Sequence, residues 1–164
     1  MNLPAADFRL PDLDGQMHLP SAALGRILVL NFWSVECPWS ARTDQLLREW
    51  RTGWGERVAV WTIAANAGED PAEQRREAAA RGLQLLLLDP GHQAADLYQA
   101  ETTPHVFVID AAGSLRYRGA VDDVTFRQRS PTRFYLREAV EALLAGQAPP
   151  LAETPAYGCT ILRG

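Results

Sequence analysis

The sequence predicts an α/β fold in which a central mixed β-sheet carries helices on both faces. Strands alternate with helices along most of the chain, a pattern that usually builds parallel strand pairs with right-handed crossovers. Two strands, 27–33 and 58–63, are continuous apolar runs, as expected for strands covered on both faces. A turn at Asp14-Gly15 between two short segments, 8–10 and 17–19, predicts an N-terminal β-hairpin extension.

The first long helix is expected to begin directly after the first buried strand. Pro38 suits the first helical position, because it lacks the N–H group that would be left unpaired there. From Pro38 to about Trp50 the apolar residues follow the helical period, with Leu46, Leu47 and Trp50 on one face. The sequence therefore predicts a strand, a short connection and an amphipathic helix over 27–50.

The remaining elements continue the alternation. A second helix is expected to start at Asp70-Pro71 and to stop at Gly82, a residue type that commonly ends helices. Further along the chain the pattern predicts a short strand at 85–88, a short helix at 94–98, strands at 106–109 and 115–118 joined by a turn, and a final amphipathic helix at 133–144.

Length and composition fit one globular domain. The chain has 164 residues, 47% of them hydrophobic and 22% charged, so we expect a single domain over 1–164. Residues 146–164 form a C-terminal tail, Pro-rich at its start, that carries Cys159. The formal net charge of −4 does not suggest nucleic acid as a partner, which would call for a basic face.

No apolar run approaches the roughly 20 residues of a membrane span, so no membrane association is expected. The first residues have neither a basic nor an apolar segment of the kind found in signal peptides. We expect a cytoplasmic protein, the alternative being an exported one whose signal segment is not part of this sequence.

Cys37 is the main candidate for chemistry. It lies between the buried strand and the helix that begins at Pro38, where free backbone N–H groups and the helix dipole favour the reactive thiolate. Glu36 would oppose this effect if it lies close, since a second negative charge disfavours the thiolate. Trp33 and Trp39 are expected to shield the thiol and to shape a surface for a partner chain. The alternative is an inert, buried cysteine at the end of a strand.

The stretch Asn31-Phe32-Trp33 followed by Cys37 resembles the thioredoxin-like redoxins, which include the TlpA-like thiol-disulfide oxidoreductases and the AhpC/TSA (peroxiredoxin-type) group. Other segments that resemble this group are 5–10 with Asp14-Gly15, 103–110, 117–119 and the tail 157–161. The resemblance covers essentially the whole chain. It implies a thioredoxin-like fold and thiol-disulfide oxidoreductase activity on protein or low-molecular-weight thiols and disulfides, with peroxides as a further candidate.

The resemblance also assigns roles to residues. It makes Cys37 the attacking thiol, Pro104 a cis-proline that faces it, and Thr103 the residue whose peptide group hydrogen-bonds an extended substrate chain. The residues expected to contact substrate are Trp33, Ser34, Pro38, Trp39, Ser40, Thr103 and Pro104. No cofactor is expected, and the isolated His18, His92 and His105 predict no metal site.

The sequence departs from the usual Cys-x-x-Cys centre, because Ser40 stands where the second cysteine is expected. A hydroxyl cannot resolve a mixed disulfide by thiol exchange. One interpretation makes Cys159 a distant resolving thiol, which requires the tail to bring the two Cα atoms within roughly 7 Å. Another leaves Cys37 to work alone, with glutathione or another external thiol completing the cycle.

Two further interpretations remain open. Cys37 is a candidate peroxidatic cysteine, since Ser34 stands where peroxiredoxins have Thr or Ser, although Leu30 replaces their usual proline. Their arginine is also missing at the matching position, Pro104, so an arginine such as Arg42, Arg116 or Arg118 would have to substitute. The last interpretation is a non-catalytic module that keeps the fold and binds extended peptides.

Overall fold

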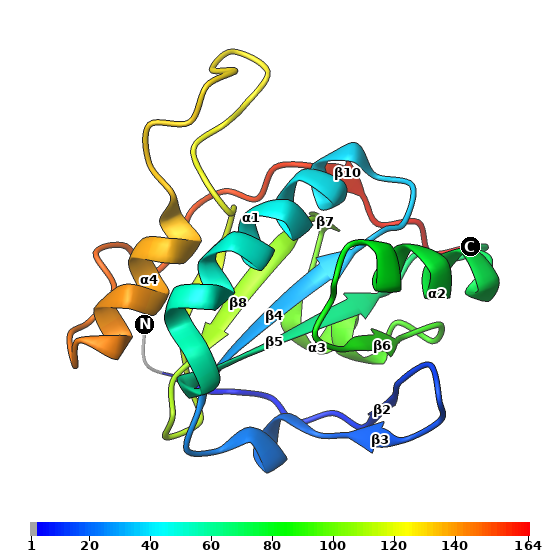
Figure 1. Cartoon of the computed structure of the whole chain (residues 1–164), viewed down its shortest axis with the longest axis horizontal. Helices are drawn as coiled ribbons and strands as arrows, with labels where there is room; N and C mark the ends of the chain where they lie inside the picture. The colour runs from blue at the N-terminus through cyan, green and yellow to red at the C-terminus, as the bar shows by residue number, and fades with distance from the viewer. Residues whose placement is uncertain (1–2) are drawn as a thin grey trace.

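The computed structural model describes residues 3–164 (Figure 1). Within this range six strands form the central sheet, in the order β1-β9-β8-β4-β5-β6. These strands are β1 (Leu3–Pro4), β4 (Ile27–Trp33), β5 (Val58–Ala64), β6 (Leu86–Leu88), β8 (His105–Ile109) and β9 (Ser114–Gly119). β4, β5 and β6 pair in parallel, whereas β8 and β9 are antiparallel to their neighbours. The predicted mixed sheet is therefore confirmed.

Helices cover both faces of this sheet. The helices are α1 (Pro38–Trp54), α2 (Pro71–Ala80), α3 (Gln93–Tyr98) and α4 (Tyr135–Leu144), with short 3-10 turns at η1 (Pro20–Ala23) and η2 (Gly55–Arg57). On one face Val29 of β4 packs with Leu47 of α1 and Leu136 of α4. On the other face Leu30, the next residue of β4, packs with Ala94 of α3. This alternation along one strand confirms the two-sided arrangement (Figure 1).

The two continuous apolar runs are buried along their whole length. Every residue of β4 and β5 is buried, and the two strands pair from Ile27–Val58 to Trp33–Ala64. Burying a large aliphatic side chain contributes about 1.5–3 kcal/mol relative to leaving it exposed. The end of β4, which leads into the Cys37 segment, is therefore held by the most deeply buried part of the molecule.

Two short strand pairs lie outside the central sheet. β2 (Leu10–Pro11) and β3 (Met17–His18) form the predicted N-terminal hairpin, with Gly15 in its turn at φ 87°. β7 (Thr102–Thr103) pairs antiparallel with β10 (Cys159–Thr160) near the C-terminus. This second pair has no periodic sequence pattern that predicts it, and it brings the tail to the Cys37 segment.

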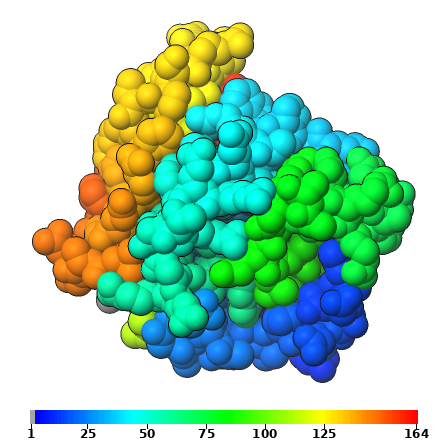
Figure 2. All heavy atoms as spheres, viewed as in Figure 1, coloured from blue at the N-terminus to red at the C-terminus, as the bar shows by residue number. Residues whose placement is uncertain are grey.

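The segment that joins β9 to α4 forms an arm that projects from the body of the molecule (Figures 1 and 2). Phe126 near its tip is 68% exposed. The arm is closed by backbone hydrogen bonds between Thr125 and Gln128. Among residues 3–164, no helix has the length and apolar character needed to cross a bilayer.

Candidate active site

Cys37 lies at the start of α1, where it is the N-cap residue and Pro38 takes the first helical position. Its thiol donates a hydrogen bond to the carbonyl oxygen of Thr103, with a distance of 3.1 Å between sulfur and oxygen. The Thr103–Pro104 peptide bond is cis, as the sequence analysis expected. Cys37 is only 3% exposed. The candidate nucleophile is therefore a covered thiol that contacts the residue before the cis-proline.

Cys159 lies beside the same residue. β10 pairs antiparallel with β7 in a register that places Cys159 directly opposite Thr103. Each cysteine shifts the pKa of the other, and both are free thiols. Two cysteines that are distant in the sequence thus both lie beside Thr103. Cys37 contacts its carbonyl oxygen, and Cys159 is its partner in the strand pair.

The close approach of the tail depends on Gly158. A Cβ atom at this position would lie 2.2 Å from the carbonyl oxygen of Thr103 and 2.8 Å from its carbonyl carbon. Both neighbours are backbone atoms, which cannot rotate away as a flexible side chain would. Glycine is therefore required for β10 to lie against β7 in this register.

The tail is fastened on both sides of Cys159. Before it, the Tyr157 ring meets the Trp39 ring edge to face, with ring centroids 5.2 Å apart. After it, the buried Ile161 joins the main core and donates its N–H to the carbonyl of Glu101 at 3.1 Å. Leu162 then donates its N–H to the Asn66 side chain at 2.8 Å. These contacts fix the position of Cys159.

The two thiols differ in acidity because of their surroundings. Burial alone would raise the pKa of Cys37, but hydrogen bonds outweigh it and leave this pKa below the ordinary thiol value. They come from the Cys159 thiol and from the backbone N–H groups of Ser40 and Trp39 at the start of α1. Burial raises the pKa of Cys159 to about 12, and the hydrogen bond and charge of Cys37 add to the increase. Of the two thiols, Cys37 is therefore the one that loses its proton at lower pH.

This difference predicts how the thiols titrate. Because its pKa is lowered, Cys37 should keep its thiolate to lower pH than an ordinary cysteine, and it should become a thiol only below that pKa. Replacing Cys159 with alanine removes a hydrogen bond that lowers the pKa of Cys37, so the midpoint should move to higher pH. Ultraviolet absorbance of the thiolate measures both midpoints. A midpoint that is unchanged in Cys159→Ala would contradict the described contact between the thiols.

Five of the seven residues expected to contact substrate are buried instead, namely Trp33, Ser34, Ser40, Thr103 and Pro104. Trp33 is fully buried and donates its indole N–H to the Asp44 carboxylate at 2.7 Å, so the prediction that it shapes a partner surface is wrong. The reason is the strand alternation, which turns the Trp33 side chain toward the face covered by α1. Ser34 and Ser40 are also buried, and the Ser40 hydroxyl accepts a hydrogen bond from the Ser34 N–H at 3.3 Å. These serines support the segment before Cys37 and do not face a partner.

The other two expected contact residues, Pro38 and Trp39, reach the surface. Pro38 is exposed and Trp39 is partly exposed, so both are available to a bound molecule. Thr103 is buried, but its carbonyl contacts Cys37. Glu36 is exposed and is not among the groups that shift the pKa of Cys37.

Asp44, Arg81 and Glu69, which were not predicted from the sequence, form hydrogen bonds that hold the segment leading to Cys37. The Asp44 carboxylate accepts hydrogen bonds from both Trp33 and Arg81, and burial raises the pKa of Asp44 to about 6 although these bonds lower it. Arg81 also donates to the carbonyl of Val35 at 3.1 Å. Glu69 accepts a hydrogen bond from the Ser34 hydroxyl. These contacts join β4, α1 and α2 under the segment 34–37.

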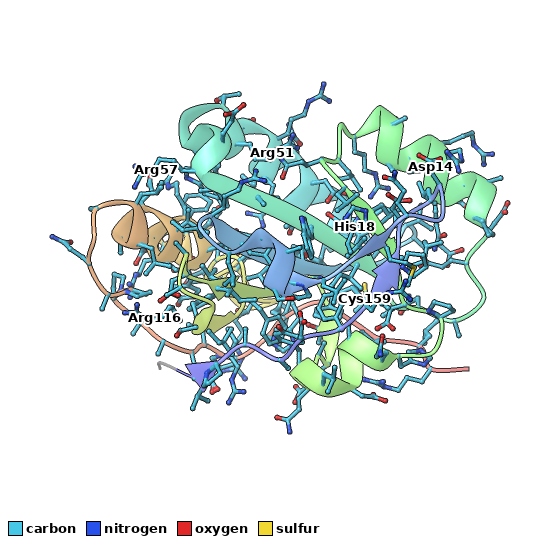
Figure 3. All side chains as sticks on the ribbon, turned by 90° about the horizontal axis from the view of Figure 1, so that it is seen from below. Asp14, His18, Arg51, Arg57, Arg116 and Cys159 are labelled. Carbon is cyan, nitrogen blue, oxygen red and sulfur yellow. The ribbon has the colours of Figure 1, made fainter. Side chains whose placement is uncertain are left out.

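The three arginines considered as peroxide-binding groups are all ion-paired. Arg42 pairs with the buried Asp122 at 2.7 Å and Arg118 pairs with Glu153 at 3.0 Å. Arg116 pairs with Asp110 near the end of the sheet where β4 begins, whereas Cys37 follows the end of β4. Figure 3 shows Arg116 and Cys159 well apart. No described contact joins these three guanidinium groups to the Cys37 thiol.

The comparisons with known proteins agree with this geometry. Residues 1–118 match the AhpC/TSA family. The chain belongs to the AhpC/TSA family. The part that matches this family includes the segment with Cys37 and the cis-proline, but the tail with Cys159 lies outside it.

Individual relatives place this family member among redoxins. The chain is 28% identical over 113 residues to the thiol-disulfide oxidoreductase ResA of Geobacillus thermodenitrificans. The matched segment covers 68% of this chain but only 64% of the relative. The crystal structure of a hypothetical protein from Sinorhizobium meliloti has a TM-score of 0.87 at 29% identity, covering 98% of this chain and 93% of that one. A putative thiol:disulfide interchange protein DsbE from Chlorobium tepidum has a TM-score of 0.68 at 20% identity, covering 88% and 95%. The predicted thioredoxin-like fold is confirmed.

Proposed function

We propose that this protein is a thiol-disulfide oxidoreductase in which Cys37 attacks a substrate disulfide and Cys159 resolves the product. The observation that carries the proposal is the pairing of β10 with β7, which sets Cys159 beside the Cys37 thiol. The family membership and the relatives named as thiol-disulfide oxidoreductases support the same reaction class. Of the alternatives, the external-thiol cycle differs only in what attacks the mixed disulfide.

The first step is attack by the Cys37 thiolate on one sulfur of the substrate disulfide. A bond forms between Cys37 Sγ and that sulfur, the substrate S–S bond breaks, and the other substrate sulfur leaves as a thiolate. Because its pKa is lowered, Cys37 provides more of the attacking thiolate than an ordinary cysteine does. The product of this step is a mixed disulfide at the start of α1.

The second step regenerates a free substrate thiol. Once Cys37 is in a disulfide it no longer carries the charge that raises the pKa of Cys159, so Cys159 loses its proton more readily. Its thiolate attacks Cys37 Sγ, the Cys37–Cys159 bond forms, and the substrate leaves as a thiolate. The substrate disulfide is thereby reduced to two thiols and the protein dithiol is oxidised. An external dithiol returns the protein to its starting state.

Cys37 is almost fully buried, and its thiol contacts Thr103. Because β10 lies against the same residue, access to Cys37 requires movement of the tail. Ile161→Ala should loosen this cover. We expect it to lower the free energy of unfolding by about 2–5 kcal/mol and to speed the first step with a small disulfide by about tenfold. Stopped-flow measurement of the first step tests this. The exposed Leu162→Ala in the same tail is the control, and equal rates in both variants would contradict the role of the tail as a cover.

Displacing Cys159 without removing either thiol tests the proposed function. Gly158→Val places a side chain against the Thr103 backbone, so β10 should separate from β7 while the central sheet is untouched. The first step should remain, and the resolving step should slow by about tenfold, the rate then depending on external thiol. Thr160→Val, an exposed position on the same strand, is the matched control. A resolving step of wild-type rate in Gly158→Val would contradict the assignment of Cys159.

Peroxide is a less favoured substrate, because Arg42, Arg116 and Arg118 are each paired with a carboxylate. A purely peptide-binding role would not use the lowered pKa of Cys37 or the closeness of the two thiols. Rapid formation of a sulfenic acid with micromolar peroxide would favour the peroxidase. Absence of any adduct with either peroxide or a disulfide would favour the binding module.

A further inference from the structure

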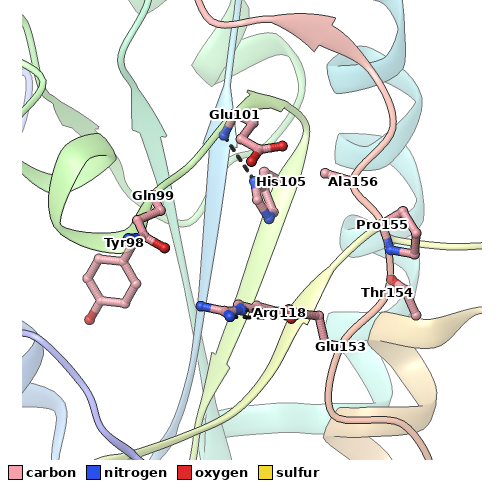
Figure 4. Close-up of a pocket in the computed structure, with 9 residues that line it drawn as sticks. All are labelled: Tyr98, Gln99, Glu101, His105, Arg118, Glu153, Thr154, Pro155 and Ala156. Carbon is pink, nitrogen blue, oxygen red and sulfur yellow. Dashed lines mark hydrogen bonds and ion pairs between the residues drawn. The ribbon is translucent and has the colours of Figure 1, made fainter.

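A cavity of about 360 Å³ lies behind the tail, outside the thiol site (Figure 4). Its walls include the end of α3 at Tyr98, the strands β8 and β9, and the tail residues 153–156. Neither cysteine lines it. Its walls carry one histidine, one arginine and two carboxylates, which are His105, Arg118, Glu101 and Glu153, besides the polar side chains of Tyr98, Gln99 and Thr154. No step of the proposed disulfide exchange uses any of these side chains.

His105 directs an unpaired donor into this cavity. The residue is 7% exposed, and its Nδ1 atom accepts a hydrogen bond from the Glu101 N–H at 3.2 Å. Burial and the charge of Arg118 lower the pKa of His105 to about 4, so the ring is neutral near pH 7. In a neutral ring whose Nδ1 is an acceptor, Nε2 carries the proton. That N–H has no hydrogen-bond partner among residues 3–164, and the ring edge faces the cavity (Figure 4).

The charged groups around the cavity have both signs. Arg118 donates from Nε and Nη2 to the Glu153 carboxylate, at 3.0 and 3.3 Å, and its Nη1 group has no hydrogen bond to another described residue. Glu101 is exposed at the rim and its carboxylate is not in an ion pair within residues 3–164. One cation and two carboxylates would repel a simple anion. They match a molecule that carries a carboxylate and an ammonium group together.

We propose that this cavity binds a small zwitterion of the α-amino acid class. Its carboxylate accepts hydrogen bonds from His105 Nε2 and from the free Nη1 group of Arg118. Its ammonium group faces the Glu101 carboxylate at the rim, since the Glu153 carboxylate is already paired with Arg118. The Tyr98 ring and the tail around Pro155 offer apolar surface to an uncharged side chain. The cavity volume is large enough for a free amino acid.

Binding of matched ligands to the reduced, full-length protein tests this proposal. The probes are L-leucine, 4-methylpentanoate, which lacks the ammonium group, and 3-methylbutylamine, which lacks the carboxylate. Leucine should bind at least about tenfold more tightly than either of the other two, because only it satisfies both sets of groups. It should also shift the NMR resonances of the His105 ring. Leucine that binds no better than its two partial analogues, or that leaves the His105 ring unchanged, would overturn the proposal.

Variants separate the cavity from other surface sites. His105→Phe keeps a ring against Phe107, whose centroid lies 4.6 Å from that of His105, but removes the donor. Glu101→Gln removes one carboxylate without touching the buried ring. Calorimetry should show leucine binding weakened about tenfold in each variant. Binding should be unchanged in Arg116→Gln, because Arg116 lies on β9 as Arg118 does but pairs with Asp110 outside the cavity. Equal binding by wild type, His105→Phe and Glu101→Gln would contradict the site. The test needs neither thiol, so its outcome is independent of the proposed redox function.

Discussion

Replacing Cys37 with serine is expected to abolish disulfide exchange, lowering the rate by about 100-fold or more. The hydroxyl that takes its place cannot attack a disulfide as a thiolate does, and burial, the largest cause of the raised pKa of Cys159, still disfavours the Cys159 thiolate in this variant. Serine should preserve the fold, because it is close to cysteine in size at the same N-cap position. The measurement is the rate at which the protein reduces a small disulfide in the presence of excess reductant.

The control for this substitution is the behaviour of Cys159 alone. In Cys37→Ser the charge of Cys37 is absent, so the pKa of Cys159 should fall below its value in the wild type. Even so, Cys159 sits in a strand without the helix N-terminus that serves Cys37. Exchange at the wild-type rate in Cys37→Ser would show that Cys159 is the nucleophile and would reverse the assignment of the two thiols.

Replacing Cys159 with serine should stop the cycle at its midpoint. The Cys37 thiolate still attacks, so a mixed disulfide forms, but no thiol of the chain can attack it. Turnover should fall by about tenfold or more, and the mixed disulfide should accumulate to nearly one per protein chain. Intact-mass spectrometry after brief exposure to a small disulfide reads this adduct directly.

A second measurement separates resolution from attack. In Cys159→Ser the turnover rate should rise in proportion to the concentration of external thiol, because that thiol now performs the resolving step. In the wild type the same dependence should be weak. A wild-type turnover rate in Cys159→Ser would support the external-thiol cycle instead, and Cys159 would then have no part in the reaction.

Much of the fold could be predicted because buried parallel strands leave a clear signal. The apolar runs 27–33 and 58–63 become β4 and β5 with almost the predicted bounds, since a strand covered on both faces must be apolar throughout. The start of α1 was equally clear from Pro38. β7 and β10 were missed because two-residue strands carry no periodicity to detect.

The site was less predictable than the fold. The sequence identifies Cys37 from its position between strand and helix, but the position of Cys159 depends on how the whole tail lies. The tail is held by contacts such as that of Ile161 with the core, and no local sequence pattern predicts such contacts. The prediction for Trp33 was wrong because an aromatic residue four positions before a candidate nucleophile suits both a partner surface and a core. Asp44 and Arg81 were missed because charged residues on helices usually face water.

The most direct test of the account is to locate the disulfide that forms on mild oxidation. The full-length wild-type protein is treated with a small excess of oxidised glutathione, and its peptides are identified by mass spectrometry without reduction. We expect one peptide pair, joined through Cys37 and Cys159 of the same chain. A stable glutathione adduct on Cys37 with Cys159 left as a free thiol would contradict it.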